Sequence, residues 1–221
     1  MVEVYPMLQF THILLFVYWL GADLGVFMAS HYVARPDLHT DERTRFLALL
    51  VALDMGPRTA LVLMIPTGAA MIWLAGWLPL EGAPTATIVA VSLGWLALVW
   101  YLHRRTSIHT LWRTIDMALR SLVVVTMFTL GALIVTGTVL SGPLWLGIKF
   151  MAYAGAVLCG LLLRGVLRTW ATGFSELRDP GTVPQGNLRI AGAKRVSTRY
   201  AMVLWACVLV AAFCGVVKPI G

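Results

Sequence analysis

The chain consists of long apolar stretches separated by short polar connections. A helix that crosses the hydrocarbon core of a bilayer needs about 20 apolar residues. Six stretches reach or approach that length, and they run over Met7–Val33, Phe46–Ala75, Thr85–Leu102, Leu119–Leu140, Leu144–Leu167 and Tyr200–Val217. The pattern therefore predicts an all-α fold, a bundle of six transmembrane helices that forms a single transmembrane domain over residues 1–221.

Proline and glycine indicate where these helices bend and where the chain leaves them. Pro57 and Pro66 lie inside the second apolar segment, and we expect them to kink this helix. The stretch Thr172–Arg199 contains Pro180, Pro184 and four glycines. That composition predicts the only substantial loop of the chain.

The composition predicts a membrane protein without a soluble domain. The mean hydropathy is +0.82 and only 12% of the residues are charged, which is far more apolar than a water-exposed surface tolerates. The formal charge of +7 does not indicate nucleic acid as a partner, because the basic residues lie at the ends of the apolar segments instead of forming one tract. Anionic membrane lipids are their expected partners.

The basic residues also predict an orientation. They fall in the first, third and fifth connections, as Arg35, Arg43 and Arg45, then Arg104, Arg105 and Arg113, then Arg168, Arg178, Arg189, Lys194, Arg195 and Arg199. The second and fourth connections contain no lysine or arginine. Cytoplasmic connections collect basic residues. The pattern therefore predicts a multi-pass protein of the cell inner membrane with an N-out, C-out topology.

Five ionisable side chains are predicted in the cytoplasmic half of the helices, namely Asp23, Asp54, Arg58, Asp116 and Arg120. A charge at mid-membrane depth costs about 2.5–3.5 kcal/mol on insertion scales, so it needs a partner or a function. Asp54 precedes Arg58 by four residues, as Asp116 precedes Arg120, so each pair shares a helix face. We expect a structural network of ion pairs. The alternative is a proton relay, or an anchor for the carboxylates of a ligand in which Arg58 binds a cofactor.

The two pairs belong to a repeated motif. Leu53–Arg58 opens the second segment with Leu-Asp-Met-Gly-Pro-Arg, and Ile115–Arg120 opens the fourth with Ile-Asp-Met-Ala-Leu-Arg. The first four helices are therefore expected to form two related hairpins, unless the match is a coincidence.

A second polar group is predicted near the opposite membrane surface. His12 and Lys149 lie at matching depth inside the first and fifth helices. A neutral imidazole can bind iron or copper, and a desolvated lysine can act as a base or as a second polar contact. For His12, ordinary packing or hydrogen bonding is the alternative. The other histidines are weaker ligand candidates at the cytoplasmic helix ends (His31, His103 and His109) or an inert loop residue (His39).

Three short motifs resemble those of a known membrane superfamily. They are His12-Ile13 followed by Trp19 and Gly21, then Trp145-Leu146-Gly147-Ile148-Lys149, and then Val216-Val217-Lys218-Pro219-Ile220. Their order and topological side are similar to those of the HemJ-type protoporphyrinogen oxidases and the CopD-type copper-resistance proteins. Gly147 stands where HemJ-type proteins usually have a histidine, and Ser197–Tyr200 stands where they have Asn-Glu-x-Pro.

The resemblance implies a redox function. In HemJ-type proteins the first-helix histidine and the lysine of the Trp-Leu-x-x-Lys motif are the functional pair, haem b is associated with the protein, and a porphyrinogen is oxidised. By this resemblance, His12 and Lys149 would be the catalytic and cofactor-binding residues, with His12 as the metal ligand. The leading hypothesis is therefore a haem b or porphyrin-binding redox protein with a quinone as electron acceptor.

Two other functions stay open. The protein could transport copper or another small solute, or it could be a noncatalytic anchor that holds a soluble redox partner. Copper sites usually recruit methionine and cysteine, yet the ten methionines form no Met-x-x-Met cluster. Assembly into a homo-oligomer is also left open.

Reporter fusions test the predicted orientation. A fusion at Leu80, in the uncharged second connection, should give a signal from outside the cytoplasm, whereas one at Gly181, in the basic fifth connection, should give a cytoplasmic signal. A cytoplasmic signal from the Leu80 fusion would overturn the assignment.

Overall fold

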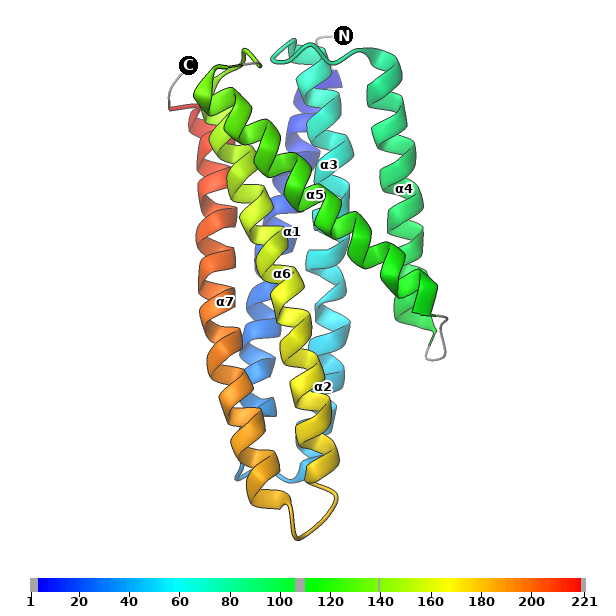
Figure 1. The fold of residues 1–221 in the computed structure, drawn as a ribbon, viewed down its shortest axis with the longest axis vertical. Helices are drawn as coiled ribbons and strands as arrows, with labels where there is room; N and C mark the ends of the chain where they lie inside the picture. Colours follow the sequence, from blue (N-terminus) through cyan, green and yellow to red (C-terminus); the bar gives the residue numbers. More distant parts are fainter. Residues whose placement is uncertain (1–3, 106–109, 139, 220–221) are drawn as a thin grey trace.

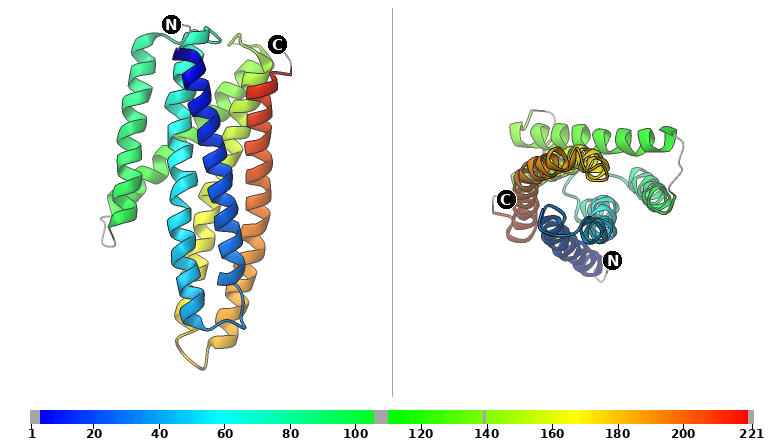
Figure 2. Two further views of the ribbon diagram at one scale, coloured as in Figure 1. Left: turned by 180° about the vertical axis from the view of Figure 1, so that it is seen from behind. Right: turned by 90° about the horizontal axis from the view of Figure 1, so that it is seen from below.

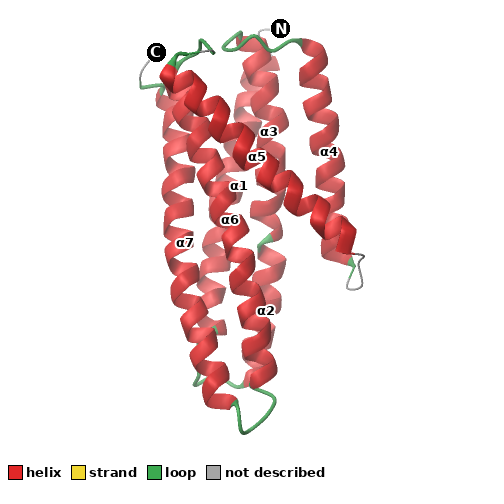
Figure 3. Cartoon of the chain, viewed as in Figure 1, coloured by secondary structure: helices red, strands yellow, loops and turns green. Residues whose placement is uncertain are grey.

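The computed structural model describes residues 4–105, 110–138 and 140–219. Every regular element in these ranges is an α-helix (Figure 3). The helices are α1 (Val4–Val33), α2 (Thr40–Leu53), α3 (Met55–Ala75), α4 (Gly82–Arg104), α5 (Thr110–Thr136), α6 (Leu144–Glu176) and α7 (Val183–Val217). Because α2 and α3 follow each other as one apolar stretch, the described chain has six helical segments that are long and apolar enough to cross a membrane. The predicted all-α fold with six spans is confirmed.

The helices form a central bundle with a peripheral pair. In the end-on view of Figure 2, α1, α3, α6 and α7 pack around one axis. Helix α5 crosses the outside of α6 diagonally, and α4 stands beyond α3 (Figure 1). Both chain termini lie at the same end of the bundle, which we name the terminal end. The other end, where α6 turns into α7, is named the hairpin end.

The second span is broken at Asp54, which separates α2 from α3. Pro57 has no N–H to donate to the carbonyl of Leu53, so the helical ladder is interrupted one turn before the proline. In the repeated motif the corresponding residue is Leu119, and α5 runs through it without a break. Pro66 lies inside α3, which also continues past it. The expected disruption is therefore found at Pro57.

The two hairpins expected from the repeated motif differ in shape. Helix α1 packs along α2 and α3, whereas α4 and α5 diverge from each other (Figure 1). Similarity between the two motifs is confined to their local Asp–Arg pairs.

The prediction of a loop over Thr172–Arg199 is wrong. Helix α6 continues to Glu176 and α7 begins at Val183, so only residues 177–182 form a turn. The glycines permit close helix packing: a Cβ at Gly186 would lie 2.9 Å from the carbonyl oxygen of Gly173. Pro184 occupies the first turn of α7, where proline is tolerated because that N–H has no helical acceptor.

These longer helices form an extension at the hairpin end. Helices α6 and α7 contain 33 and 35 residues, which corresponds to about 50 Å each, against about 30 Å for the hydrocarbon core. Polar contacts inside the extension fix it. The indole of Trp170 donates to the carbonyl of Ile190 at 3.2 Å, and buried Arg43 donates to the carbonyl of Val33 at 2.9 Å and to Asn187 at 2.7 Å.

The helices α5 and α6 meet at two glycines near the terminal end. A Cβ at Gly131 would lie 2.6 Å from the carbonyl oxygen of Gly147, and one at Gly147 would lie 3.0 Å from that of Gly131. Small residues at such crossings let backbones approach closely in a membrane, where packing and not the hydrophobic effect drives helix association. Gly147 therefore has a packing role here.

Substitution of these glycines tests the crossing. Gly131→Ala should lower the free energy of unfolding by about 1–3 kcal/mol, because the added methyl group collides with backbone atoms that cannot move easily. Gly94→Ala is the matched control, since a Cβ there meets nothing within 4 Å and alanine favours the helix. Thermal unfolding of the purified protein in micelles measures both, and equal stability of the two variants would contradict the close crossing.

Candidate functional site

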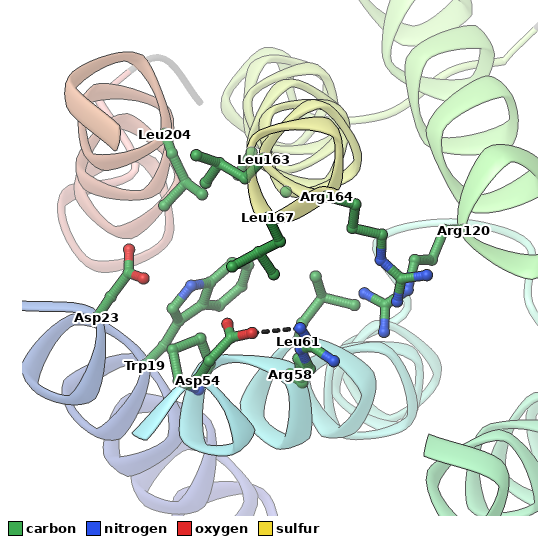
Figure 4. A pocket seen from close by; sticks show the side chains of 13 residues that line it. Trp19, Asp23, Asp54, Arg58, Leu61, Arg120, Leu163, Arg164, Leu167 and Leu204 are labelled. Carbon is green, nitrogen blue, oxygen red and sulfur yellow. Dashed lines mark ion pairs between the residues drawn. The ribbon is translucent and has the colours of Figure 1, made fainter. Parts of the chain in front are cut away.

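A small cavity lies inside the bundle, on the hairpin side of its apolar centre. Its volume is about 70 Å³, and its charged lining residues are Asp23, Asp54, Arg58, Arg120 and Arg164. They come from α1, the α2–α3 junction, α3, α5 and α6 (Figure 4). Four of the five charged residues that the sequence singles out therefore line this one cavity, together with Arg164.

Asp116 does not line the cavity but binds two of its arginines, and it is only 1% exposed. It accepts hydrogen bonds from three groups: Arg120 Nε at 3.2 Å, Arg164 Nη2 at 2.6 Å and the indole of Trp95 at 2.9 Å. One carboxylate therefore binds two guanidinium groups and connects α4, α5 and α6.

The two predicted ion pairs are confirmed. Asp116 pairs with Arg120, and Asp54 pairs with Arg58. Their environments differ, because the side chains of Asp54 and Arg58 are 22% and 28% exposed, whereas those of Asp116 and Arg120 are 2% and 5% exposed. A salt bridge with more solvent contact contributes less to stability and is also less costly to break.

Arg164 is a site residue that the sequence analysis missed. It lies inside the apolar segment assigned to the fifth helix, and it is the only arginine within Leu144–Leu167. The segment also contains Lys149, and each charged residue in such a segment is itself a signal, since intramembrane charges need partners. Its partner, Asp116, is 48 residues away in the sequence, so the pairing could not be found from spacing along one helix.

The remaining carboxylate, Asp23, has a neutral partner. Its Oδ2 accepts a hydrogen bond from the indole of Trp205 at 2.8 Å. Figure 4 shows Asp23 on one side of the cavity and the guanidinium groups of Arg120 and Arg164 on the other. Asp23 therefore does not complete the charge pairing of these two arginines.

His12 lies near the terminal end, outside the cavity lining, and faces α3. Its Nδ1 is 2.8 Å from the hydroxyl of Thr67. That hydroxyl donates its own proton to the carbonyl of Leu63 at 2.9 Å, so it can only accept from the imidazole. The hydrogen bond therefore favours the tautomer that carries its proton on Nδ1, and the lone pair is then on Nε2.

Lys149 lies at the same end, where α6 packs against α7. The side chain is half-buried and passes Gly215, whose missing side chain makes room for it. Among the described residues no hydrogen bond joins Lys149 to His12, so their expected common cavity stays a prediction.

The other histidines have local roles or lie beyond the described ranges. His31 is exposed and contacts the carbonyl of Phe27 at 2.9 Å. His39 caps α2, and His103 packs edge-on against Trp100. His109 lies outside the residues that the structure describes. Within the described ranges, no three His, Cys, Asp or Glu side chains are grouped as a metal site would require.

Comparison with known proteins finds no family model, no curated protein and no solved structure that matches the chain. The functional assignment therefore depends on the geometry of these two polar groups.

The two Asp–Arg pairs of the repeated motif provide a matched test. Asp116→Asn should lower the free energy of unfolding by about 3–5 kcal/mol, because it leaves two arginines without their buried counterion. Asp54→Asn should cost about 1 kcal/mol or less, since that pair is partly solvated. Unfolding of both variants in micelles gives the comparison, and a cost at Asp54 that equals the cost at Asp116 would refute the shared-counterion geometry.

Proposed function

We propose that the protein is a membrane redox protein that binds haem b or a porphyrin through His12, with Lys149 as the second polar contact and a quinone as electron acceptor. The observation that carries the proposal is the hydrogen bond between His12 Nδ1 and Thr67. Histidines that bind metals almost always donate their other ring N–H to an oxygen, which fixes the tautomer and the ring orientation. His12 has this arrangement before any ligand is considered.

The donor chemistry of the described residues fits one axial position of a haem. His12 Nε2 is the nitrogen with the free lone pair in the tautomer that Thr67 favours, and Gly68 presents no side chain toward the ring. An iron porphyrin held there would supply one-electron transfer, with a potential set by the axial ligand and its surroundings.

Lys149 would bind the ligand by charge. Its ammonium group can donate to a porphyrin carboxylate, or it can hold a proton at Nζ beside the reacting group. Thr67 is a positioning residue, because it touches His12 and orients the imidazole. The expected role of Arg58 in cofactor binding stays a prediction, since Arg58 is engaged by Asp54.

The cavity among the inner charges does not provide space for a tetrapyrrole. Its volume of about 70 Å³ is well below the 300–1,000 Å³ or so of pockets that enclose drug-sized ligands. The proposal therefore assigns the porphyrin to the terminal end with His12.

Transport of a small solute is the second candidate function. A charged cavity inside a membrane bundle favours it, since intramembrane ionisable residues mark substrate pathways. No observation favours copper as the transported solute, because the described residues contain no group of three His, Cys, Asp or Glu side chains that could hold a metal ion.

Haem titration of the purified protein tests the redox proposal. The wild-type protein should develop a Soret band on addition of haem, and His12→Ala should abolish or shift it because the axial nitrogen is lost. Thr67→Val should leave the haem bound with an altered spectrum or reduction potential, because the imidazole loses its orienting acceptor.

His31→Ala is the matched control, since His31 lies at the other end of α1 and is exposed. Its Soret band should equal that of the wild-type protein. Identical spectra for the wild-type, His12→Ala and His31→Ala proteins would exclude His12 as the ligand.

A further inference from the structure

One polar atom of a residue that lines the inner cavity is buried without a partner among the described residues. Arg120 is 4% exposed, it lines the cavity, and its Nη2 is buried without a hydrogen-bond acceptor among the described residues. Its Nε binds Asp116, and its guanidinium also lies over the ring of Trp95 at 5.5 Å. An unpaired donor on a buried cation is costly, so an acceptor is expected at this atom.

The charge count around Arg120 points to a negative ligand. Asp116 serves both Arg120 and Arg164, so this cluster has one positive charge more than it has negative charges. Of the two carboxylates that line the cavity, Asp54 pairs with Arg58, and Asp23 accepts a hydrogen bond from Trp205 on the far side. A single negative charge at Arg120 Nη2 would balance the cluster of Asp116, Arg120 and Arg164.

The side of the cavity opposite the two arginines carries the apolar side chains of Trp19 and Leu204 together with the carboxylate of Asp23 (Figure 4). The volume of about 70 Å³ holds about five water-sized spheres, so only a small group fits. The cavity is not sealed, because the Arg164 side chain is 23% exposed.

We propose that this cavity binds a singly charged oxyanion that carries a small apolar group. Its oxygens accept hydrogen bonds from Arg120 Nη2 and from the Arg164 guanidinium, and its apolar part lies against Trp19 and Leu204. Guanidinium groups suit this role because their planar N–H donors match the spacing of carboxylate and phosphate oxygens. Two sources share this chemistry, a free short-chain carboxylate and the phosphodiester headgroup of an anionic lipid.

The site is independent of the haem proposal, because its lining does not include His12, Thr67 or Lys149. Its test is therefore made on haem-free protein and reads binding, not redox activity. Failure of one proposal leaves the other intact.

A pair of glycines in α6 provides the decisive variants. Gly160 lines the cavity and Gly165 does not, and a Cβ at either position meets nothing within 4 Å. Gly160→Val adds side-chain volume beside the cavity without touching a charge, and Gly165→Val makes the same change on the same helix outside the lining.

The experiment measures the melting temperature of delipidated protein in neutral micelles during titration with sodium butyrate, with sodium chloride matched for ionic strength. A parallel arm uses nanodiscs of phosphatidylcholine with or without phosphatidylglycerol. We expect butyrate or phosphatidylglycerol to raise the melting temperature of the wild-type and Gly165→Val proteins, and the rise to be lost in Gly160→Val. Butyrate as the active probe identifies a free carboxylate, and phosphatidylglycerol alone identifies a lipid headgroup.

A second pair of variants tests the arginine directly. Arg120→Lys keeps the charge but removes Nη2, so it should weaken butyrate or phosphatidylglycerol binding at least tenfold. Arg43→Lys is the control, since Arg43 Nη2 is also buried without a partner among the described residues but does not line the cavity. No stabilisation of the wild-type protein by either probe, or equal stabilisation of all variants, would overturn the proposal.

Discussion

The interaction on which this structure depends is the neutralisation of two arginines by one buried carboxylate. The Asp116 carboxylate accepts hydrogen bonds from Arg120 on its own helix and from Arg164 on α6. It also accepts one from the indole N–H of Trp95 on α4. In a bilayer an unpaired charge costs several kcal/mol, so this contact fixes the place of the peripheral pair α4–α5 against the central bundle. The same sharing leaves one guanidinium nitrogen without an acceptor at the cavity.

The polar groups of the membrane region are separated by an apolar centre. Trp19 and Leu61 belong to the main buried cluster, and Tyr153 packs edge-on against Trp19 and donates to the Leu61 carbonyl at 2.6 Å. On the terminal side of this centre lies His12, whose hydrogen bond to Thr67 favours one tautomer. On the hairpin side lies the charged cavity. The proposals assign a porphyrin to the first of these places and a small oxyanion to the second.

The sequence predicts what depends on local spacing. The apolar lengths give the six spans, and the four-residue spacing gives the Asp54–Arg58 and Asp116–Arg120 pairs. The contacts Arg164–Asp116 and His12–Thr67 join residues 48 and 55 positions apart, so only the fold reveals them. The prediction of a loop over Thr172–Arg199 was wrong because the glycines of this stretch serve helix packing. Of its prolines, Pro180 lies in the short connection 177–182 and Pro184 lies in the first turn of α7.

The most direct test of the shared counterion is a double-mutant cycle between Asp116 and Arg164. The free energies of unfolding of the wild-type protein, Asp116→Asn, Arg164→Gln and the double variant are measured in the same micelles. If Asp116 holds both arginines, Arg164→Gln costs much less in the Asp116→Asn background than in the wild-type protein, with a coupling energy of about 1 kcal/mol or more. Additive costs, equal within about 0.5 kcal/mol, would contradict the account.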